Sequence, residues 1–312
     1  MSSDPIGVVK RELLVRQLDS WAPAALHRSR RATFAQAYAG ADGGVADAAL
    51  RVFGEFADLL HGRRMTALTC GRADDQDLAA RHAAVQSELP GGLAAHLVPG
   101  GVDRLPVALK AAAANGAPIL AYLDVTGAYL DGAGGPEPAA QVLAAVAGGR
   151  PAELLLVLDP PAWSRADHRS RLTEAGLPLV TEVELVADDR AEVLIFATAA
   201  GRRLDAFKNA LWAVDEYAGV CYRDPGDPQG HLLDISLTPH PGPLRRELLA
   251  RLASVGPASV TELRQFTAER TVYRPADTNR VLGALLAAGL VSREPEAGRL
   301  GGDVTITARP PA

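Results

Sequence analysis

Short apolar runs alternate with longer amphipathic segments through residue 237 of the chain. The apolar runs are ATFAQAY (32–38), MTALTC (65–70), LAAHLV (93–98), PILAYLD (118–124), ELLLVLD (153–159) and EVLIFAT (192–198), with a later pair near 219–224 and 231–237. Parallel strands that are covered on both faces carry apolar residues on both faces. We therefore expect each run to form a buried β-strand.

The segments between these runs show helical spacing. A leading helix is expected over 8–21, where Val8, Leu13, Leu14 and Leu18 share one face. Further helices are expected over residues 45–60, 76–89, 102–115, 137–147, 165–175 and 202–214. Strands that alternate with helices predict an α/β fold with a doubly wound, mostly parallel, Rossmann-like sheet.

The pattern changes after the segment TPHPGP, which carries three prolines and a glycine and ends at Pro243. Three short helices are expected over 244–255, 259–269 and 275–288, followed by two strands around a turn rich in proline and glycine. Ser259 and Glu262 have the spacing of a capping box at the start of the second helix. We therefore predict a Rossmann-like domain over 1–238, a linker over 239–243 and a winged-helix domain over 244–312.

Composition adds limits to this picture. The 312 residues are enough for two domains, and the net charge of −5 is spread unevenly. The part that begins at Leu244 contains ten arginines and seven acids, so the predicted winged helix is the part best suited to a phosphate backbone. Cys70 and Cys221 are far apart, and the seven histidines form no ligand pattern, so no metal site is expected. Without an apolar stretch of membrane length or a leader pattern, we expect a cytoplasmic protein that makes no membrane contact.

The segment from Glu192 to Pro228 resembles the three-Cys-motif partner family, in which a strand is followed by a helix of pattern Lys-x-x-x-Trp-x-x-Asp. Lys208, Trp212 and Asp215 match that pattern. Further agreement comes from the leading helix and the segments AYAG, LDVTG, HRSRLTEAGLP and ERTVYRP. The resemblance implies a domain similar to class I methyltransferases, a C-terminal winged helix, and a radical-type partner protein that carries three cysteines.

The resemblance also implies where S-adenosylmethionine would bind. The family has an Ala-Gly-Pro-Gly loop preceded by an aspartate, and Gln36 stands at the position of that aspartate here. The candidate cofactor-binding residues are Gly40, Asp42, Gly43 and Gly44. The Asp42 carboxylate replaces the second glycine and would repel the carboxylate of the cofactor.

The acids that would bind the ribose and the adenine of S-adenosylmethionine are also missing from the ends of the second and third predicted strands. The second predicted strand ends at Gly71, and the nearest acids are Asp74 and Asp75; the third is followed by no acid before Asp103. We therefore expect no cofactor, with S-adenosylmethionine as the alternative.

Two aspartates are the candidate catalytic residues. Asp124 ends the fourth predicted strand in LDVTG, where the family has Leu-Asp-Pro-Phe-Gly, and the carboxyl ends of strands border the ligand crevice of open α/β sheets. Asp159 lies in LDPPAW, which resembles the Asp-Pro-Pro-aromatic motif of amino-methyltransferases, with Trp163 one position late. The alternative is that these side chains only cap helices or shape turns.

The expected nucleic-acid contacts lie in the winged helix, whose third helix would enter a major groove by its N-terminal end. The candidate residues are Arg264, Arg274, Thr278, Arg280, Arg293 and Arg299. Docking of a protein is the alternative, because Asp277, Glu294 and Glu296 lie among these arginines.

The leading hypothesis is a nucleic-acid-associated accessory protein with a degenerate methyltransferase-like domain. One alternative is an active S-adenosylmethionine-dependent methyltransferase that acts on an amino group of a nucleobase or small molecule. In the other, the winged helix serves only for protein docking or dimerisation. Lys208 and Trp212 are expected to be structural, because a tryptophan at helical spacing usually belongs to a core.

Overall fold

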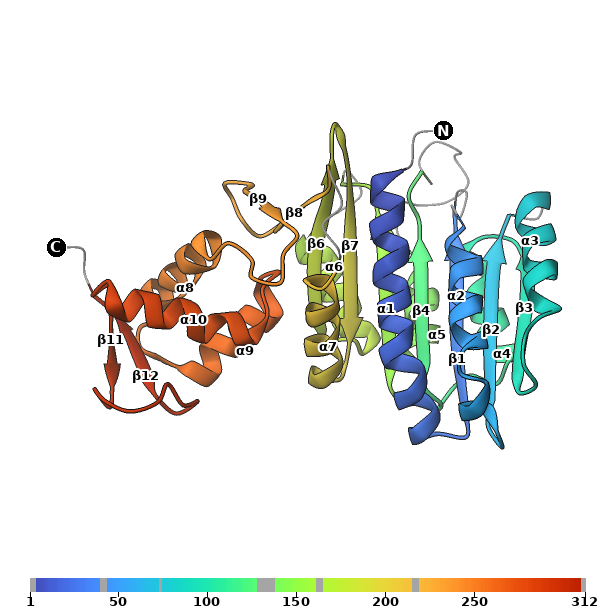
Figure 1. Ribbon diagram of the computed structural model, residues 1–312, viewed down its shortest axis with the longest axis horizontal. Helices are drawn as coiled ribbons and strands as arrows, with labels where there is room; N and C mark the ends of the chain where they lie inside the picture. The colour runs from blue at the N-terminus through green and yellow to red at the C-terminus, as the bar shows by residue number, and fades with distance from the viewer. Residues whose placement is uncertain are drawn as a thin grey trace.

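A computed structural model describes residues 4–39, 44–72, 75–127, 138–160, 165–214 and 219–309. Within these residues one nine-stranded sheet has the order β3-β2-β1-β4-β5-β7-β6-β8-β9 (Figure 1). The strands are β1 (Arg31–Tyr38), β2 (Arg64–Gly71), β3 (Leu93–Pro99), β4 (Ile119–Asp124), β5 (Ala152–Leu158), β6 (Leu179–Ala187), β7 (Arg190–Thr198), β8 (Cys221–Arg223) and β9 (Leu232–Asp234).

Strands β1 to β5 are parallel to one another, and β6 to β9 pair antiparallel. This arrangement confirms the α/β fold with a parallel core that the alternation of strands and helices predicts, and the antiparallel strands β6 to β9 make the sheet mixed. Because β7 is antiparallel to β5, the start of β7 lies at the edge of the sheet where β4 and β5 end. That reversal decides which side chains meet at the candidate site.

Helices cover both faces of the sheet. The first face carries α1 (Pro5–Arg28), α2 (Val45–Gly54), α3 (Gln76–Gln86) and α7 (Gly201–Leu211). The second carries α4 (Leu105–Ala111), α5 (Ala140–Ala147) and α6 (Arg165–Ala175). Two short 3-10 helices, Ala57–Leu60 and Val102–Arg104, lie in the connections. None of the helices in the described ranges is both long and apolar enough to cross a membrane.

The C-terminal unit lies beyond β6, at the opposite end of the molecule from β3 (Figure 1). It comprises α8 (Gly242–Val255), α9 (Val260–Arg270) and α10 (Pro275–Ala287) with a three-stranded antiparallel sheet of β10 (Ala258–Ser259), β12 (Thr305–Ala308) and β11 (Val291–Glu294). Ser259 and Glu262 form the expected capping box. This part of the chain therefore forms three helices and a small antiparallel sheet, as expected, and its assignment as a winged helix stays a prediction.

The C-terminal unit shares its hydrophobic core with the α/β domain. One continuous cluster runs from Ile6 in α1 through Trp212 to Ile306 in β12. The division of the chain at residues 239–243 therefore remains a prediction from the sequence.

Candidate functional site

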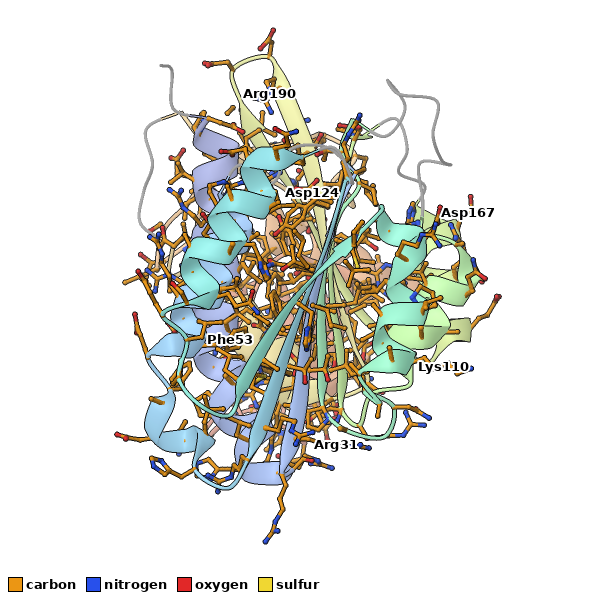
Figure 2. All side chains as sticks on the ribbon, turned by 90° about the vertical axis from the view of Figure 1, so that its right-hand side faces the viewer. Arg31, Phe53, Lys110, Asp124, Asp167 and Arg190 are labelled. Atoms are coloured by element: carbon orange, nitrogen blue, oxygen red, sulfur yellow. The ribbon has the colours of Figure 1, made fainter. Side chains whose placement is uncertain are left out.

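The carboxyl edge of the parallel strands is where the fold places the candidate catalytic aspartates. Asp124 ends β4 beside Tyr38, the last residue of β1. Figure 2 labels Asp124 and Arg190 toward one end of the sheet and Arg31 toward the other. Asp124 is buried, and its Oδ1 accepts hydrogen bonds from the backbone N–H of Thr126 at 3.1 Å and from the Thr126 hydroxyl at 2.6 Å. The side chain thus closes a turn directly after the strand.

The other carboxylate oxygen of Asp124 faces a buried lysine from α1. Lys10 Nζ lies 2.8 Å from Asp124 Oδ2 and 2.7 Å from Glu192 Oε2. Glu192 comes from the start of β7, which the strand reversal brings to this edge. Burial acts to lower the pKa of Lys10, but the two carboxylates outweigh it and leave that pKa above its ordinary value. Burial raises the pKa of Glu192, against the effect of Lys10.

Gln36, at the position of the family's aspartate, is fully buried and held by three internal hydrogen bonds. Its amide nitrogen donates to Thr69 Oγ1 at 2.9 Å and to the Ala46 carbonyl at 3.3 Å, and its amide oxygen accepts from the Tyr38 hydroxyl at 2.8 Å. Two of the three partners are acceptors, so the environment suits an amide rather than a carboxylate.

The glycine loop is described only at its end. Gly44 has a φ of +82°, a left-handed conformation that favours glycine, and it caps the N-terminus of α2. Gly40, Asp42 and Gly43 lie outside the described residues.

Of the two acids that follow β2, only one lies in a described range. Asp75 accepts a 2.8 Å hydrogen bond from the backbone N–H of Leu78 and so caps α3. Asp74 lies outside the described residues. The described acid nearest to the end of β2 is therefore engaged as a helix cap.

Asp159 links two loops at the same edge. Its Oδ2 accepts a 2.9 Å hydrogen bond from the backbone N–H of Gly127, which has a φ of +74°. The loop after β4 is thereby fixed to the end of β5. Trp163, the aromatic residue of the LDPPAW motif, lies outside the described residues.

Several of the expected nucleic-acid contacts are already engaged within the C-terminal unit. Arg274 and Arg280 both bind Asp277, with closest distances of 2.9 and 3.3 Å. Arg264 Nε donates to Asn279 Oδ1 at 2.8 Å. Thr278 is fully buried and donates to Thr267 Oγ1 at 2.9 Å, so it lies in the interior, away from the surface expected from the sequence.

The remaining two arginines belong to the wing between β11 and β12. Arg293 donates to four backbone carbonyls of the turn, those of Pro295, Ala297, Gly298 and Arg299. The Arg299 side chain is exposed. Arg293 therefore shapes the wing, and Arg299 is the wing arginine that is open to a partner.

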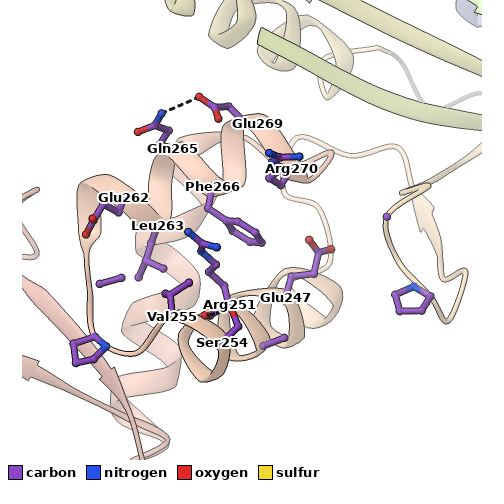
Figure 3. A pocket seen from close by; sticks show the side chains of 15 residues that line it. Glu247, Arg251, Ser254, Val255, Glu262, Leu263, Gln265, Phe266, Glu269 and Arg270 are labelled. Atoms are coloured by element: carbon purple, nitrogen blue, oxygen red, sulfur yellow. Dashed lines mark hydrogen bonds between the residues drawn. The ribbon is translucent and has the colours of Figure 1, made fainter. Parts of the chain in front are cut away.

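A groove of about 860 Å³ lies between α8 and α9, away from the carboxyl edge (Figure 3). The Arg251 guanidinium lies 5.6 Å from the centre of the Phe266 ring. Val255 is 44% exposed beside them, and Glu262 and Glu269 lie on the α9 side.

The structure adds residues that the sequence reasoning did not select. Lys10 and Gln17 lie on the buried stripe of α1, and each binds a buried acid, with Gln17 Nε2 lying 2.6 Å from Glu153 Oε2. Arg203 pairs with the same glutamate at 2.7 Å. The sequence signal for Lys10 and Gln17 is that these polar residues share one helix face with the apolar residues Ile6, Leu13 and Trp21.

The comparisons with known proteins identify no family. No family model and no curated protein matches the chain. Among solved structures, a variant of the 16S rRNA (adenine(1408)-N(1))-methyltransferase from Catenulisporales acidiphilia matches with a TM-score of 0.34 and 19% identity over 58% of this chain and 91% of that one. The delta-N METTL16 MTase domain matches with a TM-score of 0.35 and 14% identity over 60% and 83%. EvdMO1 matches with a TM-score of 0.34 and 14% identity over 65% and 44%.

These are distant similarities of fold. The architecture itself is a mixed nine-stranded sheet, with a small three-stranded C-terminal sheet and its helices beside it. The resemblance to the three-Cys-motif partner family, and the partner protein it implies, stay predictions.

Proposed function

We propose that this chain is a nucleic-acid-associated accessory protein whose methyltransferase-like domain does not itself transfer methyl groups. The observation that carries the proposal is the engagement of acids at the carboxyl edge. Asp75 caps α3, Asp124 binds Lys10 and Thr126, and Asp159 binds the loop after β4. Asp124 uses both of its carboxylate oxygens within the fold, and Asp75 and Asp159 each use one, whereas a cofactor's ribose and amino groups need acceptors that are free to receive them.

Gln36 supports the same conclusion from the neighbouring strand. Its amide donates to an oxygen of Thr69 and to the Ala46 carbonyl. A carboxylate at this position would face the Ala46 carbonyl without a proton to donate, and the Thr69 hydroxyl would have to turn and donate to it.

The nucleic-acid part of the proposal rests on the C-terminal unit. Its helices and strands follow the winged-helix order, and the part of the chain from Leu244 onward carries a surplus of positive charge. Arg299 is exposed on it, and Arg280 is partly open to solvent although it also binds the Pro239 carbonyl and Asp277. Such side chains bind phosphates without reading sequence, so we propose contacts to the backbone of a duplex.

A methyl-transfer assay tests the catalytic half of the proposal. The full chain is incubated with radiolabelled S-adenosylmethionine and with DNA, RNA or cell extract, and we expect no incorporation. Asp124→Asn and, as a matched control at the same edge, Asp103→Asn are assayed beside it. Incorporation that survives in Asp103→Asn and disappears in Asp124→Asn would establish the alternative, a methyltransferase that uses Asp124.

Salt-dependent duplex binding tests the other half. Fluorescence anisotropy of a labelled DNA duplex should give an affinity that falls with salt, and Arg299→Ala should reduce the slope of log K against log salt by about one. An affinity that does not depend on salt would leave protein docking as the use of this unit.

A further inference from the structure

The turn between α9 and α10 is fixed in the α/β domain by a buried lysine. Lys208, from α7, donates to the carbonyls of Thr267 at 2.9 Å, Thr271 at 2.6 Å and Tyr273 at 2.7 Å. Its three N–H groups are thereby satisfied by three acceptors from the C-terminal unit. Lys208 is fully buried, so removal of the side chain would leave these carbonyls without partners.

Two further side chains of the α/β domain complete the contact. Trp212 Nε1 donates to the Val272 carbonyl at 3.0 Å, and the indole stacks on Tyr273 with ring centres 5.8 Å apart. The Val272 N–H donates to Asp224 Oδ2 at 2.8 Å. We call Lys208, Trp212 and Asp224 the latch. The carbonyls of all three residues from Thr271 to Tyr273 are bound by it, which gives the Lys-x-x-x-Trp pattern a physical role.

A second contact covers the start of α10. The chain from residue 237 to 240, which we call the strap, runs past this helix end and offers its carbonyls to it. Arg274 donates to Leu237 at 2.7 Å, Arg280 to Pro239 at 2.9 Å, and the Tyr273 hydroxyl to His240 at 2.7 Å. The strap therefore occupies the two arginines nearest to the end of the helix that a winged helix inserts into a groove.

We infer that the latch and the strap form an autoinhibitory contact that keeps the N-terminal end of α10 closed against the protein and away from duplex nucleic acid. The inference rests on the proposed function, because it assumes that a duplex is the partner. Opening of the contact releases Arg274 and Arg280 from the carbonyls of the strap and frees those N–H groups for phosphates, while both arginines keep their ion pairs with Asp277 on the same helix. Charge-assisted hydrogen bonds to phosphate are stronger than those to a neutral carbonyl, so a duplex favours the open state.

The test compares latch variants with a surface control. Lys208→Met removes the three donated bonds, Trp212→Phe removes one donor while it keeps an aromatic ring, and Lys110→Met changes an exposed lysine on α4. Hydrogen exchange of the full chain should show protection lost across residues 237–309 in both latch variants and retained in β1, β4 and β5. Binding to a short labelled DNA duplex at low salt should tighten at least about tenfold, which corresponds to about 1.4 kcal/mol. Arg274→Ala and Arg280→Ala in the same background should abolish that gain.

Two results would overturn the inference. In one, protection falls equally in β4 and in α10, which would make the contact part of the general core. In the other, residues 237–309 open but duplex affinity stays unchanged. If Lys208→Met does not fold, Trp212→Phe decides between the outcomes. Neither result depends on S-adenosylmethionine. Failure of the autoinhibitory contact can therefore be told apart from failure of the proposal that the domain transfers no methyl groups.

Discussion

The ammonium of Lys10 lies 2.8 Å from the carboxylate of Asp124, although 114 residues separate the two in the chain. One partner comes from the first helix and the other from the end of the fourth strand. Glu192, at the start of β7, completes the buried group. The group stands at the carboxyl ends of the parallel strands, where open α/β sheets bind their ligands, so this edge is organised around a structural lysine.

Removal of the lysine should destabilise the fold strongly. Lys10→Met leaves Asp124 and Glu192 buried without their cation, and breaking a buried pair in this way costs about 3 to 5 kcal/mol. The free energy of unfolding, measured in urea, should fall by that amount, while Lys110→Met on the surface changes it by less than about 0.5 kcal/mol. A loss for Lys10→Met as small as that of the control would show that the pair contributes little.

An aspartate at position 36, where the resemblance to the three-Cys-motif partner family would place one, should not create a cofactor site. Gln36→Asp removes the amide that donates to Thr69 and to the Ala46 carbonyl, and an unpaired buried acceptor costs about 1 to 3 kcal/mol or more when charged. Gln36→Asn is the matched control, because it has the length of aspartate and keeps the amide. We expect urea unfolding to rank wild type above the control and the control above Gln36→Asp. A Gln36→Asp protein as stable as wild type would contradict the interpretation of this position.

Stability should rise with pH through the action of Lys208. Burial lowers its pKa to about 7 in the folded protein, from 10.5 as the ordinary value, against the opposing effect of Asp224. Between these values the unfolded chain binds more protons than the folded one, so the free energy of unfolding increases with pH. From pH 7 to 8.5 the gain should be about 1 to 2 kcal/mol.

The measurement is urea unfolding at several pH values in that window. The pH series stops below pH 9 because of the Cys70 thiol, whose pKa burial raises to about 11 in the folded protein. Above pH 9 this thiol ionises in the unfolded chain only, which lowers the free energy of unfolding as pH rises. Lys208→Met should lose the rise, and the surface control Lys110→Met should retain it. Equal slopes in wild type and Lys208→Met would assign the pH dependence to other groups.

The fold could be predicted from the sequence, except where polar residues interrupt an apolar pattern. The runs that became β1 to β5 are continuous and apolar, and their positions agree with the structure to within one or two residues. Strand β6 was missed because Glu182 and Glu184 break its pattern; Glu182 is buried and pairs with Arg169 at 2.9 Å. A paired acid inside a strand resembles a surface residue when only the sequence is seen.

The candidate site was predicted less completely. The position of Asp124 at a strand end follows from local pattern, and the structure confirms that position. Its partners could not be predicted, because they depend on the antiparallel entry of β7 and on the rotation of α1 over the sheet. Lys208 and Trp212 show the same limit: their helix was expected, but the turn that they bind begins about 60 residues later in the chain.

Titration calorimetry with S-adenosylmethionine tests the central claim most directly. With the carboxylates at the edge engaged and Gln36 in place of the family's aspartate, we expect no binding with a Kd below about 1 mM. Gly40→Val, which adds bulk to the glycine loop, should give the same absence of heat as wild type. A micromolar Kd in wild type that is lost in Gly40→Val would contradict the account and show that the domain is a cofactor-binding methyltransferase.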